Sequence, residues 1–141
     1  MLAQANITYK ATLPDKHQFA RLYATTGWNA TYQLSDDELF HAISSSWYVI
    51  GAYDRDSLVG SGRLVSDGIS HALILDLIVL PEYQGQGIGS SILRQLIAHC
   101  EAHQMRDIQL FSATGKAGFY KRFGFEERPP DAPGMQIRRK M

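Results

Sequence analysis

The chain has 141 residues, 45% of them hydrophobic and 20% charged, and its formal net charge is zero. This length suits one compact domain, and the balance of residue types excludes a disordered chain. A neutral chain offers no broad basic surface, so we expect no nucleic-acid partner. The single cysteine, Cys100, excludes an internal disulfide framework. No apolar run could span a bilayer and the first residues lack a signal-peptide pattern, so we expect a cytoplasmic protein with no membrane partner.

The first third of the chain predicts one strand and two helices. Residues 7–12 alternate between apolar and polar side chains, as a strand does. Residues 14–26 begin with Pro-Asp and carry apolar side chains at helical spacing, and Gly27 ends this helix. Residues 28–34 are expected to form an aromatic connection. The sequence Ser-Asp-Asp-Glu at residues 35–38 is a capping box, which predicts the start of a second short helix.

The middle of the chain predicts three strands and a long helix. Residues 47–53 and 58–65 are rich in aromatic and β-branched side chains, and residues 71–80 are almost wholly apolar. Asp-Gly at residues 67–68 is typical of a hairpin turn between the second and third of these strands. Apolar residues at helical spacing predict a helix over residues 88–103.

The last third of the chain predicts a short strand over residues 108–111 and a short helix over residues 116–123. Phe125 is expected to begin a last strand, with residues 135–138 as its partner across a proline-rich loop. Hairpin strands followed by a crossover helix and a parallel strand give a mixed sheet with helices on both faces.

Three glycines at alternate positions lie in the segment PEYQGQGIGSSIL, residues 81–93, between the third hairpin strand and the long helix. Glycines let several backbone N–H groups converge at the start of a helix, where the helix dipole is positive. Such a turn can hold a phosphate or pyrophosphate group, although a turn without a ligand explains the glycines equally well. Ser90 excludes both a P-loop, which needs lysine there, and the dinucleotide-binding fingerprint.

Two motifs resemble those of the GCN5-related N-acetyltransferase (GNAT) family. Residues 77–81 (LIVLP) followed by residues 84–89 (QGQGIG) are similar to its motif A, and residues 118–126 (GFYKRFGFE) are similar to its motif B. The resemblance implies one N-acetyltransferase domain over residues 1–141 with an α/β (α+β) fold. That fold has a mixed, mostly antiparallel sheet of six to seven strands, splayed between the fourth and fifth strands, with helices on both faces.

The resemblance also implies how the cosubstrate acetyl-CoA is held. Its pyrophosphate would lie on the amides of the glycine-rich loop, with the Ser90 hydroxyl as a further contact. Its pantetheine arm would pair with the end of the strand before the loop. Many members carry asparagine where this chain has Ala113, so either the Ser112 or Thr114 hydroxyl supplies that contact or the contact is absent. The expected cofactor-binding residues are Leu77, Ile78, Val79, Gln84, Gly85, Gln86, Gly87, Ile88, Gly89, Ser90 and Ser112.

The reaction implied by the resemblance is acyl transfer, and it suggests Tyr120 as the general acid that protonates the departing thiolate. Packing on a short helix is the other interpretation of Tyr120. Asp76 is the only charge in an apolar strand, and burial of a carboxylate there requires hydrogen bonds or a use. It is therefore either the general base or a structural carboxylate near a bulge in the strand. His71 is a weaker candidate for the base. No metal site is expected.

Aromatic side chains are the expected lining of the acceptor site, namely Trp28, Tyr32 and Tyr48, although packing explains them too. The segment FYKRFGFEERPPDAPGM and the aspartate before the glycine-rich loop look similar to the serotonin N-acetyltransferase-like group within the family. An arylalkylamine is therefore the first expected acceptor, and a lysine side chain or a polyamine is the second. A catalytically silent module that binds acetyl-CoA is the alternative function. Analogy with the family also allows a homodimer.

Overall fold

The computed structural model describes residues 6–139. The chain divides into two compact units, residues 1–110 (the first unit) and residues 111–141 (the second unit). The first unit holds ten elements and the second unit holds one. In chain order they are β1 (Ile7–Lys10), α1 (Lys16–Ala24), α2 (Asn29–Tyr32), α3 (Asp36–Ser44), β2 (Tyr48–Asp54), β3 (Ser57–Ser66), β4 (His71–Val79), the 3-10 helix η1 (Pro81–Tyr83), α4 (Ile88–Ala102), β5 (Asp107–Gln109) and α5 (Ala117–Lys121).

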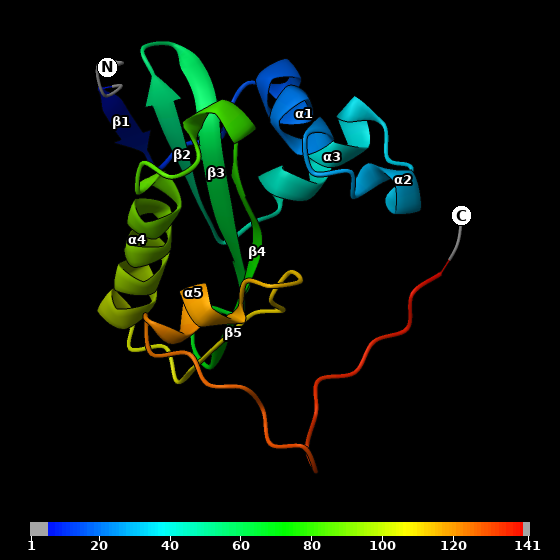
Figure 1. Ribbon diagram of the computed structural model, residues 1–141, viewed down its shortest axis with the longest axis vertical. Coiled ribbons are helices and arrows are strands. Elements are labelled where there is room, and N and C mark those ends of the chain that lie inside the picture. The colour runs from blue at the N-terminus through cyan, green and yellow to red at the C-terminus, as the bar shows by residue number, and fades with distance from the viewer. Residues whose placement is uncertain (1–5, 140–141) are drawn as a thin grey trace. The chain divides into compact units, whose positions relative to one another are not determined.

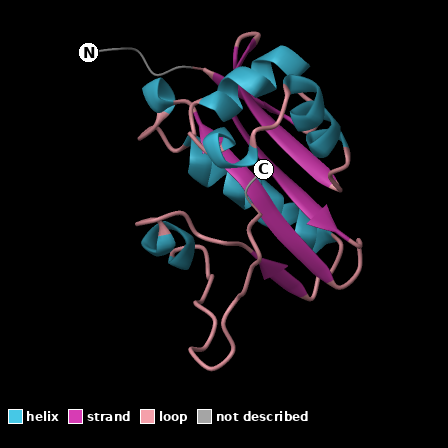
Figure 2. Ribbon diagram, turned by 90° about the vertical axis from the view of Figure 1, so that its right-hand side faces the viewer, coloured by secondary structure: helices cyan, strands magenta, loops and turns pink. Residues whose placement is uncertain are grey.

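The five strands form one mixed sheet in the order β1-β2-β3-β4-β5. Neighbours from β1 to β4 are antiparallel, and β5 runs parallel to β4. The long helix α4 covers one face of the sheet, while α1 and α3 cover the other (Figures 1 and 2). The predicted mixed sheet with helices on both faces is confirmed. Within residues 6–139, no helix has the length and apolar character needed to cross a membrane.

Side-chain caps explain where the first helices begin. The Asp15 carboxylate accepts hydrogen bonds from the amides of His17 and Gln18, so α1 begins directly after it. Ser35 and Glu38 form the predicted capping box at the start of α3. These local bonds satisfy amides that have no partner within their own helix.

The expected aromatic connection at residues 28–34 contains a short helix, α2. The Asn29 side chain donates to the carbonyl of Leu34 and accepts from its amide, at 2.9 and 2.8 Å. Gln33 adopts a left-handed conformation at the C-terminal end of α2. The prediction missed this element because four residues carry too little periodicity to show a helix.

The core between the sheet and helices α1 and α3 is built from large apolar side chains. Phe19 and Tyr23 of α1 lie against each other with ring centroids 6.1 Å apart. The cluster comprises Phe19, Leu22, Tyr23, Leu39, Ile43, Val49, Tyr53, Leu58 and Ile78. Burial of these side chains on the apolar faces of α1 and α3 supplies the main drive for their packing.

Two glycines of β3 allow α4 to lie unusually close to the sheet. A Cβ added at Gly62 would come within 2.8 Å of Cγ2 of Ile92 and 3.0 Å of Cδ1 of Leu96. A Cβ at Gly60 would meet Cγ2 of Ile88 at 3.2 Å. The glycines inside the predicted strand therefore mark a close approach between strand and helix.

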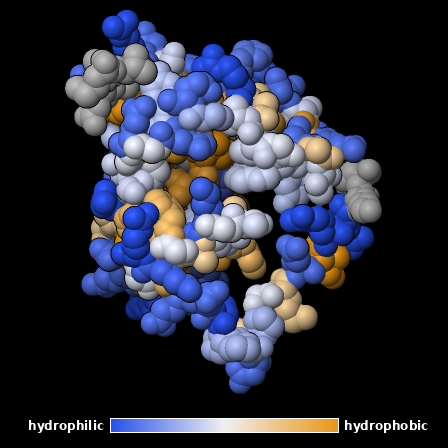
Figure 3. Space-filling view, in the orientation of Figure 1, coloured by the Kyte–Doolittle hydropathy of each residue, from blue (hydrophilic) through white to orange (hydrophobic). Residues whose placement is uncertain are grey.

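The prediction of six to seven strands is wrong for the described residues, which form five. Neither Phe125 nor residues 135–138 belong to a strand. Met135 and Ile137 are 85% and 87% exposed, so pairing them would gain no apolar burial within the second unit. Figure 3 shows hydrophobic side chains exposed along this C-terminal segment, at the right of the view. The prolines at 129, 130 and 133 also remove backbone donors that a hairpin would need.

We expect Gly62→Ala to lower the free energy of unfolding by about 1–3 kcal/mol, because the new methyl group overpacks the contact with Ile92 and Leu96. Urea unfolding followed by circular dichroism measures the change. Gly118→Ala is the matched control, since a Cβ there meets no atom within 4 Å. Equal stability of Gly62→Ala and the wild type would contradict the close packing of α4.

Candidate active site

The glycine-rich loop joins the end of β4 to the start of α4. Gly85 and Gly87 have φ angles of +81° and +82°, in the left-handed region that disfavours side chains. A Cβ at either position would meet no atom within 4 Å, so the space beside the loop is open. The loop therefore needs glycine for its backbone conformation, and it leaves room for a ligand.

The start of α4 presents unpaired backbone donors to that space. Gly87 is the N-cap of α4 and provides no side-chain cap. The first hydrogen bond of the helix runs from the amide of Ser91 to the carbonyl of Gly87, at 3.0 Å. The amides of Ile88, Gly89 and Ser90 precede it and have no acceptor within the helix. This arrangement can bind a pyrophosphate group.

Two side-chain hydrogen bonds fix the entry to the loop. The Tyr83 hydroxyl donates to Oδ2 of Asp54 at 2.6 Å and so ties η1 to the end of β2. The side chain of Gln84 donates to the carbonyl of Val79 at 3.0 Å and ties the loop to the end of β4. The hydrogen bond to Asp54 raises the pKa of Tyr83, which keeps the phenol protonated as a donor. Gln84, predicted as a cofactor contact, uses its side chain within the protein.

Strand β4 has a free edge beyond its first residues. Residues His71 to Leu73 pair with β5, and the pairing ends there because β5 has only three residues. On its other side, β4 pairs with β3 as far as Val79. Within residues 6–139, the backbone groups of Leu77, Ile78 and Val79 that point away from β3 therefore have no neighbouring strand, and only the Gln84 side chain bonds to the Val79 carbonyl. An extended ligand could pair with this edge, as the sequence predicts for the pantetheine arm.

Asp76 lies in the predicted bulge of β4, and its side chain is 19% exposed. Its Oδ2 accepts a hydrogen bond from Nε of Arg63 at 2.7 Å. Of the two interpretations of Asp76, the structural one required backbone N–H donors, whereas the donor in the structure is an arginine. The sequence analysis missed Arg63, although it is a charge within an apolar strand just as Asp76 is.

The aromatic residues predicted for the acceptor lie in two places. Trp28 packs edge-on against Tyr23 of α1, with ring centroids 5.8 Å apart. Trp28 and Tyr32 are 37% and 42% exposed, on the α1 side of the sheet. Tyr48 instead stacks on His99 of α4, with ring centroids 3.8 Å apart. Tyr48 thus lies on the face of the sheet that α4 covers, whereas Trp28 lies on the face that α1 covers.

The second unit carries Tyr120 on α5 in an aromatic cluster. Its ring centroid lies 5.1 Å from that of Phe119 and 6.1 Å from that of Phe125. Burial raises the pKa of the Tyr120 phenol, so it holds its proton at neutral pH. The exposed Ser112 hydroxyl donates to the carbonyl of Ala113 at 2.9 Å. Its lone pairs remain available to a ligand donor.

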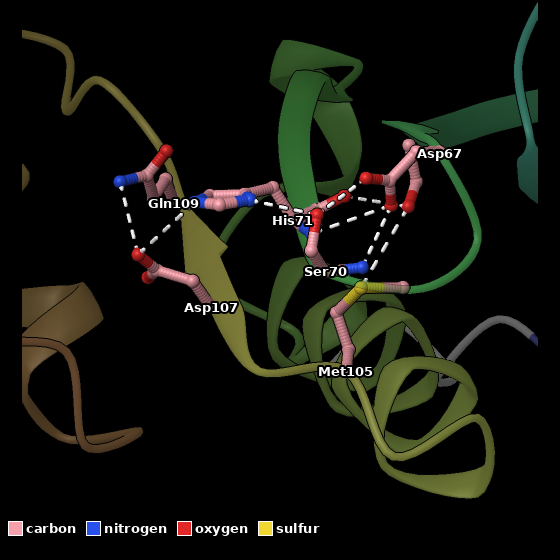
Figure 4. A network of polar contacts seen from close by, with 7 residues as sticks. Asp67, Ser70, His71, Met105, Asp107 and Gln109 are labelled. Carbon is pink, nitrogen blue, oxygen red and sulfur yellow. Dashed lines mark hydrogen bonds and ion pairs between the residues drawn. The ribbon is translucent and has the colours of Figure 1, made fainter.

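His71 belongs to a polar network at the start of β4, at the far end of the strand from the glycine-rich loop (Figure 4). Nδ1 of His71 lies 3.0 Å from Oγ of Ser70, whose hydroxyl donates to Asp67. On its other side, Nε2 lies 3.8 Å from a carboxylate oxygen of Asp107. The Ser70 proton is thus directed at Asp67, and this network closes the β3–β4 hairpin. The weaker base candidate is an exposed histidine away from the loop.

Cys100 is fully buried on the inner face of α4. Burial raises the pKa of its thiol, which keeps it protonated and unreactive. Among the described residues, no group of three or more histidine, cysteine or acidic side chains is placed to hold a metal ion.

The profile of one protein family, described as "Acetyltransferase (GNAT) domain", matches residues 45–127, more than half of the chain. The chain belongs to the GNAT family. This is a family of N-acetyltransferases whose members use acetyl-CoA. The matched residues include β4, the glycine-rich loop, α4 and Tyr120, so the predicted resemblance is confirmed.

Three known proteins illustrate which acetyltransferases this GNAT chain is similar to. A GNAT-family acetyltransferase structure from Streptococcus pneumoniae is 36% identical, with a TM-score of 0.75, and the alignment covers 94% of this chain and 97% of that one. GCN5-related N-acetyltransferase 2, chloroplastic, of Arabidopsis thaliana is 37% identical over 55% of this chain and 30% of its own length. Serotonin N-acetyltransferase 2, chloroplastic, of rice is 31% identical over 57% of this chain and 40% of its own length. The chain thus spans less than half the length of these two plant relatives.

We expect Tyr83→Phe to weaken the binding of CoA about tenfold, since it removes a hydrogen bond to a charged group that holds the loop. Isothermal titration calorimetry measures the dissociation constant. Tyr9→Phe is the matched control, because the Tyr9 hydroxyl has no hydrogen-bond partner within residues 6–139. Unchanged affinity in Tyr83→Phe would show that its bond to Asp54 does not position the loop.

Proposed function

We propose that this protein is an acetyl-CoA-dependent N-acetyltransferase that transfers the acetyl group to a primary amine. The observation that carries the proposal is the open loop of Gly85 and Gly87, which leads from the free edge of β4 to the uncapped start of α4. Convergent amides fit a pyrophosphate, and a free strand edge directly before them fits the amide-containing pantetheine arm. Both contacts that CoA needs therefore lie on one continuous stretch of chain.

The proposed reaction is direct attack by the neutral amine. The amine nitrogen forms a bond to the thioester carbonyl carbon, and a backbone N–H polarises the carbonyl oxygen. The carbon–sulfur bond then breaks and CoA departs as a thiolate. Tyr120 gives its phenolic proton to the sulfur and regains one from solvent. The amine loses its surplus proton to water.

A small arylalkylamine is the acceptor that we propose first. Trp28 and Tyr32 offer partly exposed rings on one side of the sheet, and aromatic surfaces bind flat apolar groups well. The likeness to the rice protein named for serotonin supports the same class. A lysine side chain is the second acceptor that we propose. Its support is the likeness to a soybean protein named Histone acetyltransferase TAP1, which is 35% identical over 82 residues.

A panel of amines tests this function. We expect serotonin and tryptamine to release CoA from acetyl-CoA at least about tenfold faster than spermidine or a lysine peptide, because only they bury a ring. A thiol-reactive dye measures the release, and mass spectrometry identifies the acetylated amine. If the lysine peptide reacted faster, the acceptor would be a lysine side chain and not an arylalkylamine. If CoA bound and no amine turned over, the silent module would be the better function.

Tyr120→Phe tests the general acid. We expect the turnover number to fall about a hundredfold, as is usual on loss of a general acid, while the affinity for CoA is unchanged. Because burial raises the pKa of Tyr120 above that of an ordinary tyrosine, which is about 10, the wild-type rate should decline through loss of this proton only at pH values above that ordinary value. That alkaline decline should be absent in the variant. An unchanged turnover number would leave Tyr120 with a packing role only.

A further inference from the structure

The bulge in β4 holds one residue in a conformation that needs support. Ser61 pairs with Ile78 and Arg63 pairs with Leu75, so two residues of β4 lie opposite the single residue Gly62. The first of the two, Asp76, has a φ angle of +54°. Aspartate tolerates this left-handed region better than most residues, but the conformation is still less favourable than an extended one. Interactions of its side chain must therefore help to hold it.

Arg63 supplies those interactions. Its Nε donates to Oδ2 of Asp76 at 2.7 Å, and its Nη1 lies 3.3 Å from both the carbonyl of Ala42 and Oγ of Ser46. The two charged side chains are only 14% and 19% exposed, so solvent screens their attraction little. One guanidinium thus joins β3, the bulge of β4 and the end of α3.

Tyr23 of α1 is close enough to the same pair to feel its charges. Its side chain is 5% exposed within the core under α1. Burial, and after it the negative charge of Asp76, raises the pKa of Tyr23 to about 12. The phenol therefore stays neutral at neutral pH and adds no charge near Asp76.

The position of the bulge explains how the Arg63–Asp76 pair can affect the free edge of β4. Asp76 lies after the residues of β4 that pair with β5 and directly before Leu77, the first of the three residues expected to pair with the pantetheine arm. A bulge changes the direction and twist of the strand that follows it. The conformation of Asp76 therefore sets where the N–H and C=O groups of residues 77–79 point.

We propose that Arg63 and Asp76 are a positioning pair, which orients the free edge at residues 77–79 toward the pantetheine arm of CoA. The proposal rests on the proposed function and assigns Asp76 a positioning role in place of the general base. Arg63, which no motif identifies, becomes a determinant of cosubstrate binding. Its contacts with Ala42 and Ser46 link that edge to α3.

Calorimetry with two ligands tests the pair. In the proposed binding mode CoA contacts both the loop and the free edge, whereas adenosine 3′,5′-bisphosphate lacks the pantetheine arm. We expect Arg63→Gln and Asp76→Asn each to weaken the binding of CoA about tenfold, since each leaves one buried charge without its partner. The affinity for the bisphosphate should stay unchanged in both, which a general loss of structure would not allow.

The double variant Arg63→Gln/Asp76→Asn separates positioning from base catalysis. Glutamine and asparagine can form a neutral hydrogen bond, and asparagine also tolerates the left-handed region. We therefore expect the double variant to bind CoA within about threefold of the wild type, a coupling typical of residues in direct contact. Its turnover number at saturating CoA should recover in parallel. If Asp76→Asn abolished turnover with CoA binding intact, and the double variant did not recover, Asp76 would be the base and the proposal would fail.

Arg106→Gln is the matched control. Arg106 donates to the carbonyls of Ile69 and Gln104, near the opposite end of β4 from the bulge. We expect it to bind CoA as the wild type does. If the wild type, Arg63→Gln and Asp76→Asn bound CoA with equal affinity, the positioning role of the pair would be overturned and the proposed function would still stand. A wild-type protein that binds no CoA would instead overturn the proposed function.

Discussion

The close contact between α4 and β3 is the constraint on which the candidate site depends. Without side chains at Gly60 and Gly62, the helix lies directly on the strand, and Ile88 at its first turn is 3% exposed. The start of α4 therefore cannot lift from the sheet without exposing that side chain to water. The glycine-rich loop is thus attached at both ends to rigid elements, which holds its amides in one arrangement.

The free edge of β4 depends on the same sheet from the other direction. Its pairing with β3 continues to Val79, while its pairing with β5 stops at Leu73. One side of the strand is thus firmly held and the other is open over the residues that precede the loop. A sheet that binds a ligand in this way must leave hydrogen-bonding groups unpaired. The short strand β5 achieves this, while the ladder between β3 and β4 continues past the bulge to Val79.

The neutral composition of the chain agrees with this kind of site. The loop at residues 84–90 contains no lysine or arginine, so an anion there would depend on backbone amides and the helix dipole. The charged side chains described around it act inside the protein. Asp54 accepts from Tyr83, and Asp76 accepts from Arg63. These bonds hold the backbone in place and leave its amides for the ligand.

The sequence by itself determined the features that depend on neighbouring residues. The capping box at Ser35, the period of α4 and the two spaced motifs are local patterns, and they predicted most elements and the donor side of the site. Only the tertiary structure decided which distant side chains meet. Arg63 and Asp76 are 13 residues apart, and Asp54 and Tyr83 are 29 residues apart. Strand register and the bulge bring these pairs together, and a shift of one residue would turn them to opposite faces.

The same physical reason explains what the sequence analysis predicted incorrectly. The sequence predicts residues 135–138 as the partner of a strand that begins at Phe125, but a strand forms only where a partner edge and an apolar surface are available. The sequence also expects both Trp28 and Tyr48 to line the acceptor site, and only packing shows that they lie on opposite faces of the sheet. Residue type and spacing are properties of the chain, whereas the face on which a side chain lies and the partner that it meets are set by packing.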